Sequence, residues 1–143
     1  MQLKFKVQSK IQKPVAEVFD AVHNPSKLSQ YFTTGGASGP LDAGATVIWQ
    51  FADYPGDVPV TVKEMLPNKL IAFEWGEDDK QRVEITFEAL DDHSTLVSII
   101  EGNWPETQKG LDRSYSNCHG WTQMSCCLKA FVEYGINLRK GFY

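Results

Sequence analysis

Five segments between residues 46 and 102 alternate apolar and polar side chains, and short turns separate them. In one of them, Ile71, Phe73 and Trp75 alternate with Ala72 and Glu74. A period of two is typical of a strand with one face on a core. Short turns, such as the one predicted at residues 76–80, join antiparallel neighbours. The pattern therefore predicts an antiparallel meander.

Other elements flank this meander. Residues 5–11 alternate in the same way and predict a first strand. Pro14 begins a segment with helical spacing of apolar residues, and Asn24 is suited to cap a second short helix. Residues 33–45 have the composition of a loop, and residues 117–135 predict a long final helix. The predicted fold class is α+β, with one curved antiparallel sheet of about six strands and a helix across it.

Length and charge narrow the classes of protein. The chain has 143 residues, and we expect one domain over residues 1–143. Its formal net charge is -4 and its basic residues are scattered, so we expect no nucleic-acid surface. No segment approaches the roughly 20 apolar residues of a membrane span. The N-terminal segment lacks the apolar block of a signal peptide, so we expect a cytoplasmic location.

All three cysteines lie in the final helical segment, next to His119. With Leu128 at the centre of the inner face, helical geometry places Cys126 almost opposite, and Cys118 and Cys127 on the two flanks. An intact helix cannot bring these side chains to the common point that a zinc site requires. We therefore predict ordinary reduced cysteines, no metal site and no cofactor.

The inner face of the same helix is apolar or small along its length. The residues within about 60° of Leu128 are those that should face the sheet. They are Trp121, Met124, Ser125, Phe131, Val132 and Gly135.

Residues 11–32, "IQKPVAEVFDAVHNPSKLSQYF", resemble the opening of the START-like, helix-grip superfamily. Residues 120–135, "GWTQMSCCLKAFVEYG", are similar to the closing helix of its branch related to the activator of the heat-shock-protein-90 ATPase. The segments "LIAFEW", "RVEITFEAL" and "STLVSIIEGNW" also fit that branch. The resemblance implies a curved antiparallel sheet gripping the C-terminal helix, with a cavity between them that in many members binds lipids, polyketides or other apolar molecules.

A hydrophobic small molecule is therefore the expected partner. Inward strand positions and the inner face of the helix supply the candidate ligand-binding residues. These are Trp49, Phe51, Phe73, Trp75, Phe87, Ile99, Glu101, Trp121, Ser125 and Leu128. Aromatic residues in these positions also suit a solid core. The small residues Ser125 and Gly135 favour a pocket, because larger side chains there would fill the space.

Two alternative functions stay open. If Glu101 faces apolar walls its pKa should rise, which suits acid–base catalysis in a cyclase- or hydrolase-like enzyme. Glu101 could instead lie at the open end of the cavity or pair with a basic residue such as Arg82, and a binding role without catalysis is the expectation we favour. The other alternative is an interaction module whose partner is a chaperone or a second copy of the chain.

Overall fold

The computed structural model describes residues 1–77 and 79–143. The chain runs through one strand, two short helices, six further strands and one long helix. The elements are β1 (Leu3–Ile11), α1 (Val15–His23), α2 (Pro25–Leu28), β2 (Gly36–Ala37), β3 (Thr46–Phe51), β4 (Tyr54–Leu66), β5 (Leu70–Trp75), β6 (Gln81–Asp91), β7 (Ser94–Trp104) and α3 (Gln108–Tyr134). Asp78, within the predicted turn at residues 76–80, lies outside the described residues.

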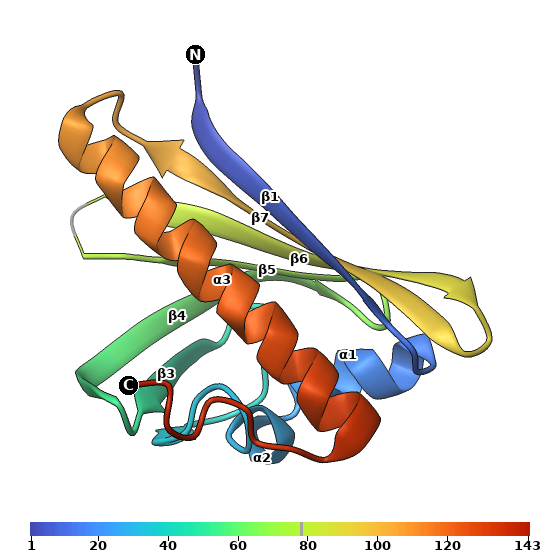
Figure 1. The fold of residues 1–143 in the computed structure, drawn as a ribbon. Helices are drawn as coiled ribbons and strands as arrows, with labels where there is room; N and C mark the ends of the chain where they lie inside the picture. Colours follow the sequence, from blue (N-terminus) through green and yellow to red (C-terminus); the bar gives the residue numbers. More distant parts are fainter. Residues whose placement is uncertain (78) are drawn as a thin grey trace.

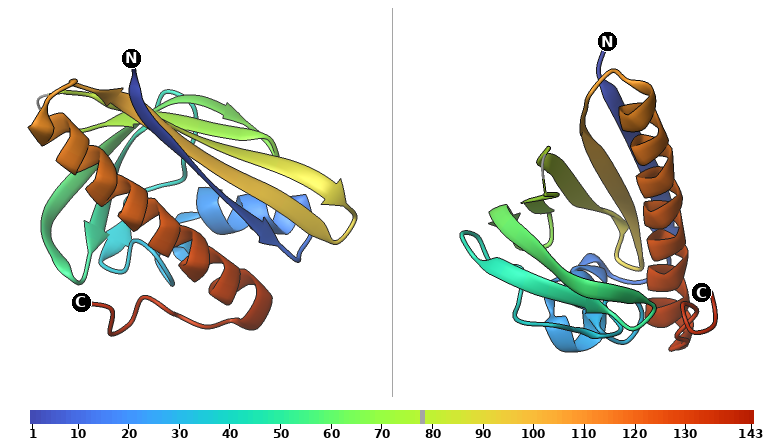
Figure 2. Two further views of the ribbon diagram at one scale, coloured as in Figure 1. Left: turned by 45° about the horizontal axis from the view of Figure 1, so that its top comes forward. Right: turned by 90° about the vertical axis from the view of Figure 1, so that its left-hand side faces the viewer.

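The seven strands form one antiparallel sheet in the order β1-β7-β6-β5-β4-β3-β2. Consecutive strands from β2 to β7 are neighbours, as the predicted meander requires, and β1 closes the other edge beside β7. In Figure 1, α3 runs obliquely across the sheet, and the side view in Figure 2 shows the sheet bending from β1 and β7 beside the helix toward β3 and β4. The predicted α+β architecture is confirmed.

The sheet has one strand more than the sequence predicts. Residues 36–37 pair with residues 49–50 of β3, inside the segment predicted to be a loop. A Cβ atom on Gly35 would stand 2.9 Å from the Gln50 backbone, so only glycine allows the approach. Gly36 has φ +122, a backbone conformation that other residues rarely adopt. A two-residue strand built on glycine shows no alternation, which is why the pattern missed it.

Strand alternation places one side of the sheet in the core. Val83, Ile85 and Phe87 of β6 are buried, and Val97 and Ile99 of β7 face the same way. The helix contributes Trp121, Met124, Ser125, Cys127 and Leu128 to the buried set. Because the sheet curves around the helix, the two elements share one apolar core.

The ends of α3 are defined by their caps. The Thr107 side chain accepts a hydrogen bond from the Gly110 amide at 3.1 Å, which satisfies one of the free amides of the first turn. Gly135 ends the helix with φ 68, the left-handed conformation that suits glycine. Gly135 is thus exposed beyond the helix, and the expectation that it leaves space on the inner face is wrong.

Within the described residues, no helix combines the length and the apolar character needed to cross a membrane.

Candidate functional site

A cavity of about 330 Å³ lies between α3, the inner side of the sheet and the C-terminal segment that follows α3. Its volume is at the lower end of the ~300–1,000 Å³ typical of small-molecule sites. The residues that line it come from five parts of the chain. They are Phe32, Phe51, Asp53, Tyr54, Val58, Trp75, Ser116, Asn117, Gly120, Trp121, Arg139 and Tyr143.

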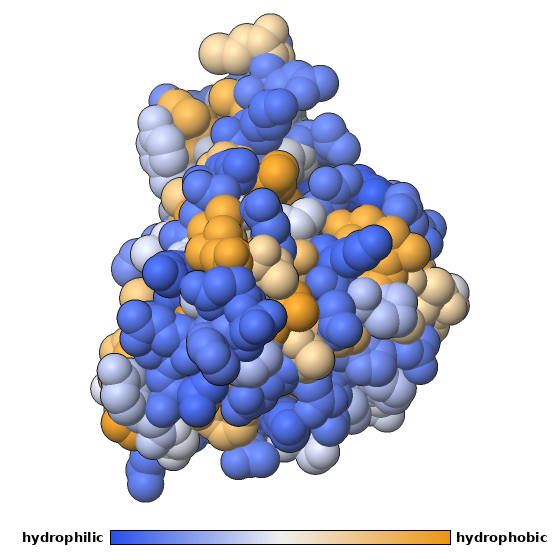
Figure 3. Space-filling view, turned by 90° about the vertical axis from the view of Figure 1, so that its right-hand side faces the viewer, coloured by the Kyte–Doolittle hydropathy of each residue, from blue (hydrophilic) through white to orange (hydrophobic). Residues whose placement is uncertain are grey.

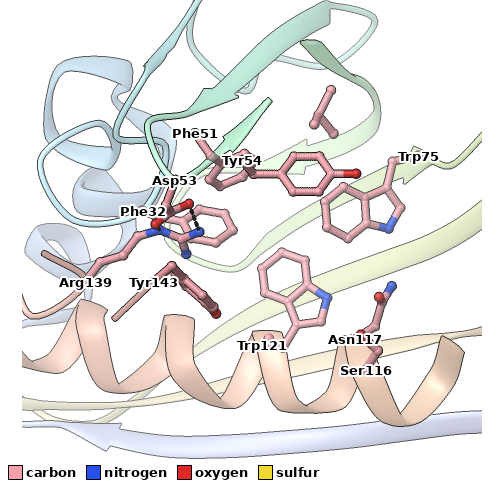
Figure 4. Close-up of a pocket in the computed structure, with 12 residues that line it drawn as sticks. Phe32, Phe51, Asp53, Tyr54, Trp75, Ser116, Asn117, Trp121, Arg139 and Tyr143 are labelled. Carbon is pink, nitrogen blue, oxygen red and sulfur yellow. Dashed lines mark hydrogen bonds and ion pairs between the residues drawn. The ribbon is translucent and has the colours of Figure 1, made fainter. Parts of the chain in front are cut away.

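Six of the twelve residues that line the cavity are aromatic (Figure 4). The rings of Trp75 and Trp121 lie 5.4 Å apart between centroids, and those of Phe32 and Trp121 lie 5.6 Å apart. Phe51 meets Phe32 edge to face at 5.2 Å. Inward alternation in β3 and β5 explains Phe51 and Trp75, and the inner face of α3 explains Trp121. These contacts fix the wall, because aromatic pairs at such distances stabilise one another.

One edge of the cavity is polar. The Arg139 guanidinium donates two hydrogen bonds of 2.8 Å to the Asp53 carboxylate, a bidentate ion pair (Figure 4). It also stacks near the rings of Phe51 and Tyr143, at 5.0 and 5.3 Å. Asp53 lies between β3 and β4, and Arg139 lies in the segment after Gly135. The ion pair therefore holds the C-terminal segment against the cavity.

Glu101 lies directly behind the two indoles, with no exposed surface. Trp75 Nε1 donates to its Oε2 at 2.7 Å, and Trp121 Nε1 donates to its Oε1 at 2.8 Å. Asn117 Nδ2 donates to both oxygens, at 3.2 and 3.1 Å. Burial raises the pKa of the Glu101 carboxyl, while these hydrogen bonds act in the opposite direction.

The pairing considered between Glu101 and Arg82 is wrong. Arg82 lies on the other side of the sheet and forms ion pairs with Glu64 and Glu84 instead. Its position follows from the register, since Arg82 alternates with the inward residues Gln81 and Val83 of β6.

The predicted ligand-binding residues separate into two groups. Phe51, Trp75 and Trp121 line the cavity, and Glu101 contacts two of them from behind. The remaining six do not line it and are buried in the core. They are Trp49, Phe73, Phe87, Ile99, Ser125 and Leu128. Alternation identifies inward side chains, but it does not show where the packed core ends and the cavity begins.

The small residue that opens the cavity is Gly120. A Cβ atom there would meet no atom within 4 Å, and Gly120 belongs to the cavity lining. Ser125 faces the core from the same helix and is not part of the lining. A small residue on α3 does leave space for the cavity, but it is Gly120 and not Ser125 or Gly135.

The three cysteines are free thiols. Cys126 is exposed, as its position opposite Leu128 predicts, whereas Cys127, on a flank of the helix, is buried. Burial raises the pKa of the Cys127 thiol to about 11. Over residues 1–77 and 79–143, no three His, Cys, Asp or Glu side chains are grouped as a metal site would require.

Solved structures show the same fold. The protein SSP2350 from Staphylococcus saprophyticus is 23% identical, with 96% of each chain covered and a TM-score of 0.83. The Aha1 dimer from Colwellia psychrerythraea is 19% identical over 93% of this chain and 98% of that one, with a TM-score of 0.77. An HSP90 activator from Plasmodium falciparum is 21% identical over 84% and 88%, with a TM-score of 0.68.

These likenesses and the observed topology identify the helix-grip, START-like fold. A search of curated proteins gives no match. The profile of the family described as Activator of Hsp90 ATPase homolog 1-like protein matches residues 12–133, which contain both helices after β1, strands β2–β7 and nearly all of α3. The chain belongs to the family of Activator of Hsp90 ATPase homolog 1-like proteins.

Proposed function

We propose that this protein binds a small, mainly apolar molecule of aromatic character in the cavity between the sheet and α3. The observation that carries the proposal is the cavity itself, about 330 Å³ with aromatic side chains at six of its twelve lining residues. Ligand sites typically combine such walls with a few polar groups that fix orientation. Here the polar groups are the Asp53–Arg139 pair at one edge and Asn117 and Ser116 elsewhere in the lining.

The volume favours a compact ligand over a bulky one. A cavity near the lower limit of small-molecule sites suits a molecule of two or three rings or a short acyl chain better than a sterol. The Asp53–Arg139 pair is neutral as a unit and both partners are mostly buried, with 17% and 12% of their side chains exposed. A ligand without net charge therefore fits this edge best, since a charged one would lose hydration without a free counter-charge.

Gly120→Leu should abolish binding without loss of fold. The new side chain enters open space in the cavity, and leucine is a better helix former than glycine. The probe is N-phenyl-1-naphthylamine, a neutral aromatic dye, followed by its own fluorescence and by thermal unfolding. At a hundredfold excess over Kd, it should stabilise the wild-type protein by about 2.7 kcal/mol and the variant not at all.

The matched control is His119→Leu, one position away on the exposed side of α3. It introduces the same side chain outside the cavity and should bind the dye like the wild type. Equal binding by Gly120→Leu would place the dye elsewhere. No thermal shift with the dye, fatty acids or flavonoid-like compounds would defeat the proposal.

Activation of a heat-shock-protein-90 ATPase is a second candidate function. The family match favours it, and one solved structure with this fold is an HSP90 activator. The C-terminal segment also exposes Ile136 and Phe142, which are 51% and 42% exposed. On the face shown in Figure 3, however, apolar residues lie in separate spots among polar ones rather than in one broad patch.

Adding the protein to Hsp90 from the same organism should raise its ATPase rate if this second function holds. The rate is measured at increasing ratios of the two proteins, with Ile136→Asp as the surface variant. Gly120→Leu serves as the control, because it fills the cavity and leaves the exposed segment unchanged. An unchanged ATPase rate at saturating protein would exclude activation of that chaperone.

A further inference from the structure

Glu101 is an unusual residue for its position. It lies on the inner side of β7, where its neighbours across the sheet are Phe5 and Val83. An apolar residue would fit there without the desolvation penalty that a buried carboxylate carries. No Lys or Arg of the described residues forms an ion pair with Glu101, and Arg113 acts on it only as a more distant charge. A carboxylate kept in such a place points to a role beyond packing.

The hydrogen bonds of Glu101 join three elements at the cavity. Each carboxylate oxygen accepts from one indole N–H, at 2.7 and 2.8 Å, and from Asn117. Trp75 belongs to β5, Glu101 to β7, and Trp121 and Asn117 to α3. All three donors line the cavity, whereas Glu101 does not. Glu101 therefore holds three residues of the cavity wall without lining the cavity itself.

Burial of an indole does not by itself require such a partner in this protein. The Nε1 atoms of Trp49 and Trp104 are buried and have no hydrogen-bond partner among the residues that the structure describes. The two tryptophans that line the cavity are the ones whose N–H groups are held by a carboxylate. Hydrogen bonding to Glu101 thus coincides with the cavity and not with burial.

We propose that Glu101 is a positioning residue, which fixes the Trp75 and Trp121 indoles so that the cavity binds its ligand by stacking on ring carbons. In Figure 4 both indole nitrogens lie on the Asn117 side of their rings, away from Phe32 and Arg139. With both N–H groups bound to Glu101, the indoles offer the ligand no hydrogen-bond donor. Selection of a flat apolar molecule follows, since a ring of matching shape gains stacking while a polar group meets no partner there. The ligand part of this inference rests on the proposed function.

Glu101→Gln tests the proposal with little change of shape. An amide has one acceptor oxygen, and its NH₂ group would face an indole N–H, so at least one indole loses its partner. NMR of the indole N–H groups should show the Trp75 or Trp121 signal shifted and in faster exchange with solvent. The affinity for N-phenyl-1-naphthylamine should fall about tenfold, because a loosened wall loses its preorganisation.

Ile99→Val is the matched control. Ile99 is buried on the same strand but lies outside the cavity lining, so this variant removes core packing and leaves the Glu101 carboxylate in place. It should leave the four indole signals and the dye affinity unchanged. Unchanged Trp75 and Trp121 signals in a folded Glu101→Gln variant, or an unchanged affinity for the dye, would overturn the positioning role.

Two further outcomes are distinguishable. If the wild type does not bind the dye but Glu101→Gln shifts the indole signals, the proposed binding function fails and the positioning role stands. If the variant does not fold, the wild type decides alone. Its Trp75 and Trp121 N–H groups should stay protected from exchange, with and without the dye, and rapid exchange of either would overturn the proposal.

Discussion

Replacing Leu128 with alanine should lower the free energy of unfolding by about 2–5 kcal/mol. Leu128 has no exposed surface and lies in the core that α3 shares with the sheet. The substitution removes buried methyl groups and leaves a cavity that a helix held by the sheet on one side cannot easily close. Urea denaturation followed by far-UV circular dichroism measures the change.

Leu66→Ala provides the comparison, because it makes the same chemical change at a residue that is 50% exposed. The loss there should stay within about 0.5 kcal/mol, as is usual for surface positions. Similar losses in the two variants would mean that the α3 contact with the sheet contributes little to stability.

The burial of Leu128 follows from helical spacing alone, and the same spacing explains where the prediction stops. Trp121, Met124 and Ser125 are buried as expected from their angles around the helix axis. Cys127 lies about 100° from Leu128 and is buried as well. Tyr31 and Arg139, which lie outside the sheet, are near its thiol, so segments other than the strands also cover α3. Helical geometry gives the direction of a side chain, but the width of the buried face depends on the partner surface.

Alternation along a strand likewise predicts which side chains point inward, but it does not predict whether an inward side chain is buried in the core or lines the cavity. Phe73 and Trp75 have the same inward orientation, yet Phe73 is fully buried and Trp75 lines the cavity. Trp75 is the last residue of β5 and is partly exposed, whereas Phe73 lies in the buried middle of the strand. No property of the two residues in the sequence encodes that difference.

The polar edge of the cavity could not be predicted from periodicity at all. Asp53 and Arg139 are 86 residues apart and lie in segments without regular alternation. They meet because Gly135 reverses the chain at the end of α3 and brings residues 136–143 back along the helix. A glycine after a helical pattern predicts a helix end, but the direction of the chain beyond it depends on tertiary contacts.

The resemblance to a known family was more informative about the fold than about the site. It implied the sheet, the gripping arrangement and a cavity, and the first two are confirmed by the strand order and the solved structures. Glu101 shows what the resemblance did not provide for the site. Its inward direction and raised pKa follow from its place in β7, but its partners come from β5 and α3. Contacts between distant elements were needed to identify what it holds.

Gly110→Ala should be among the most destabilising single-methyl changes in this protein. A Cβ atom at this position would stand 2.0 Å from the Pro105 carbonyl oxygen and 3.0 Å from its carbonyl carbon. Both are backbone atoms, so the first turn of α3 or the segment before it must move, and with it the hydrogen bond from the Gly110 amide to Thr107. We expect a loss of about 2 kcal/mol or more, since overpacking against backbone outweighs the ~0.5–1 kcal/mol that alanine gains in a helix.

Gly120→Ala is the matched control, on the same helix and with the same added methyl group. No atom lies within 4 Å of its Cβ position, so only the helix preference acts, and stability should rise by about 0.5–1 kcal/mol. Chemical denaturation of the two variants beside the wild type should therefore give shifts of opposite sign. If Gly110→Ala were as stable as Gly120→Ala, residues 105–107 could not lie as close to the first turn of α3 as the Pro105 contact requires.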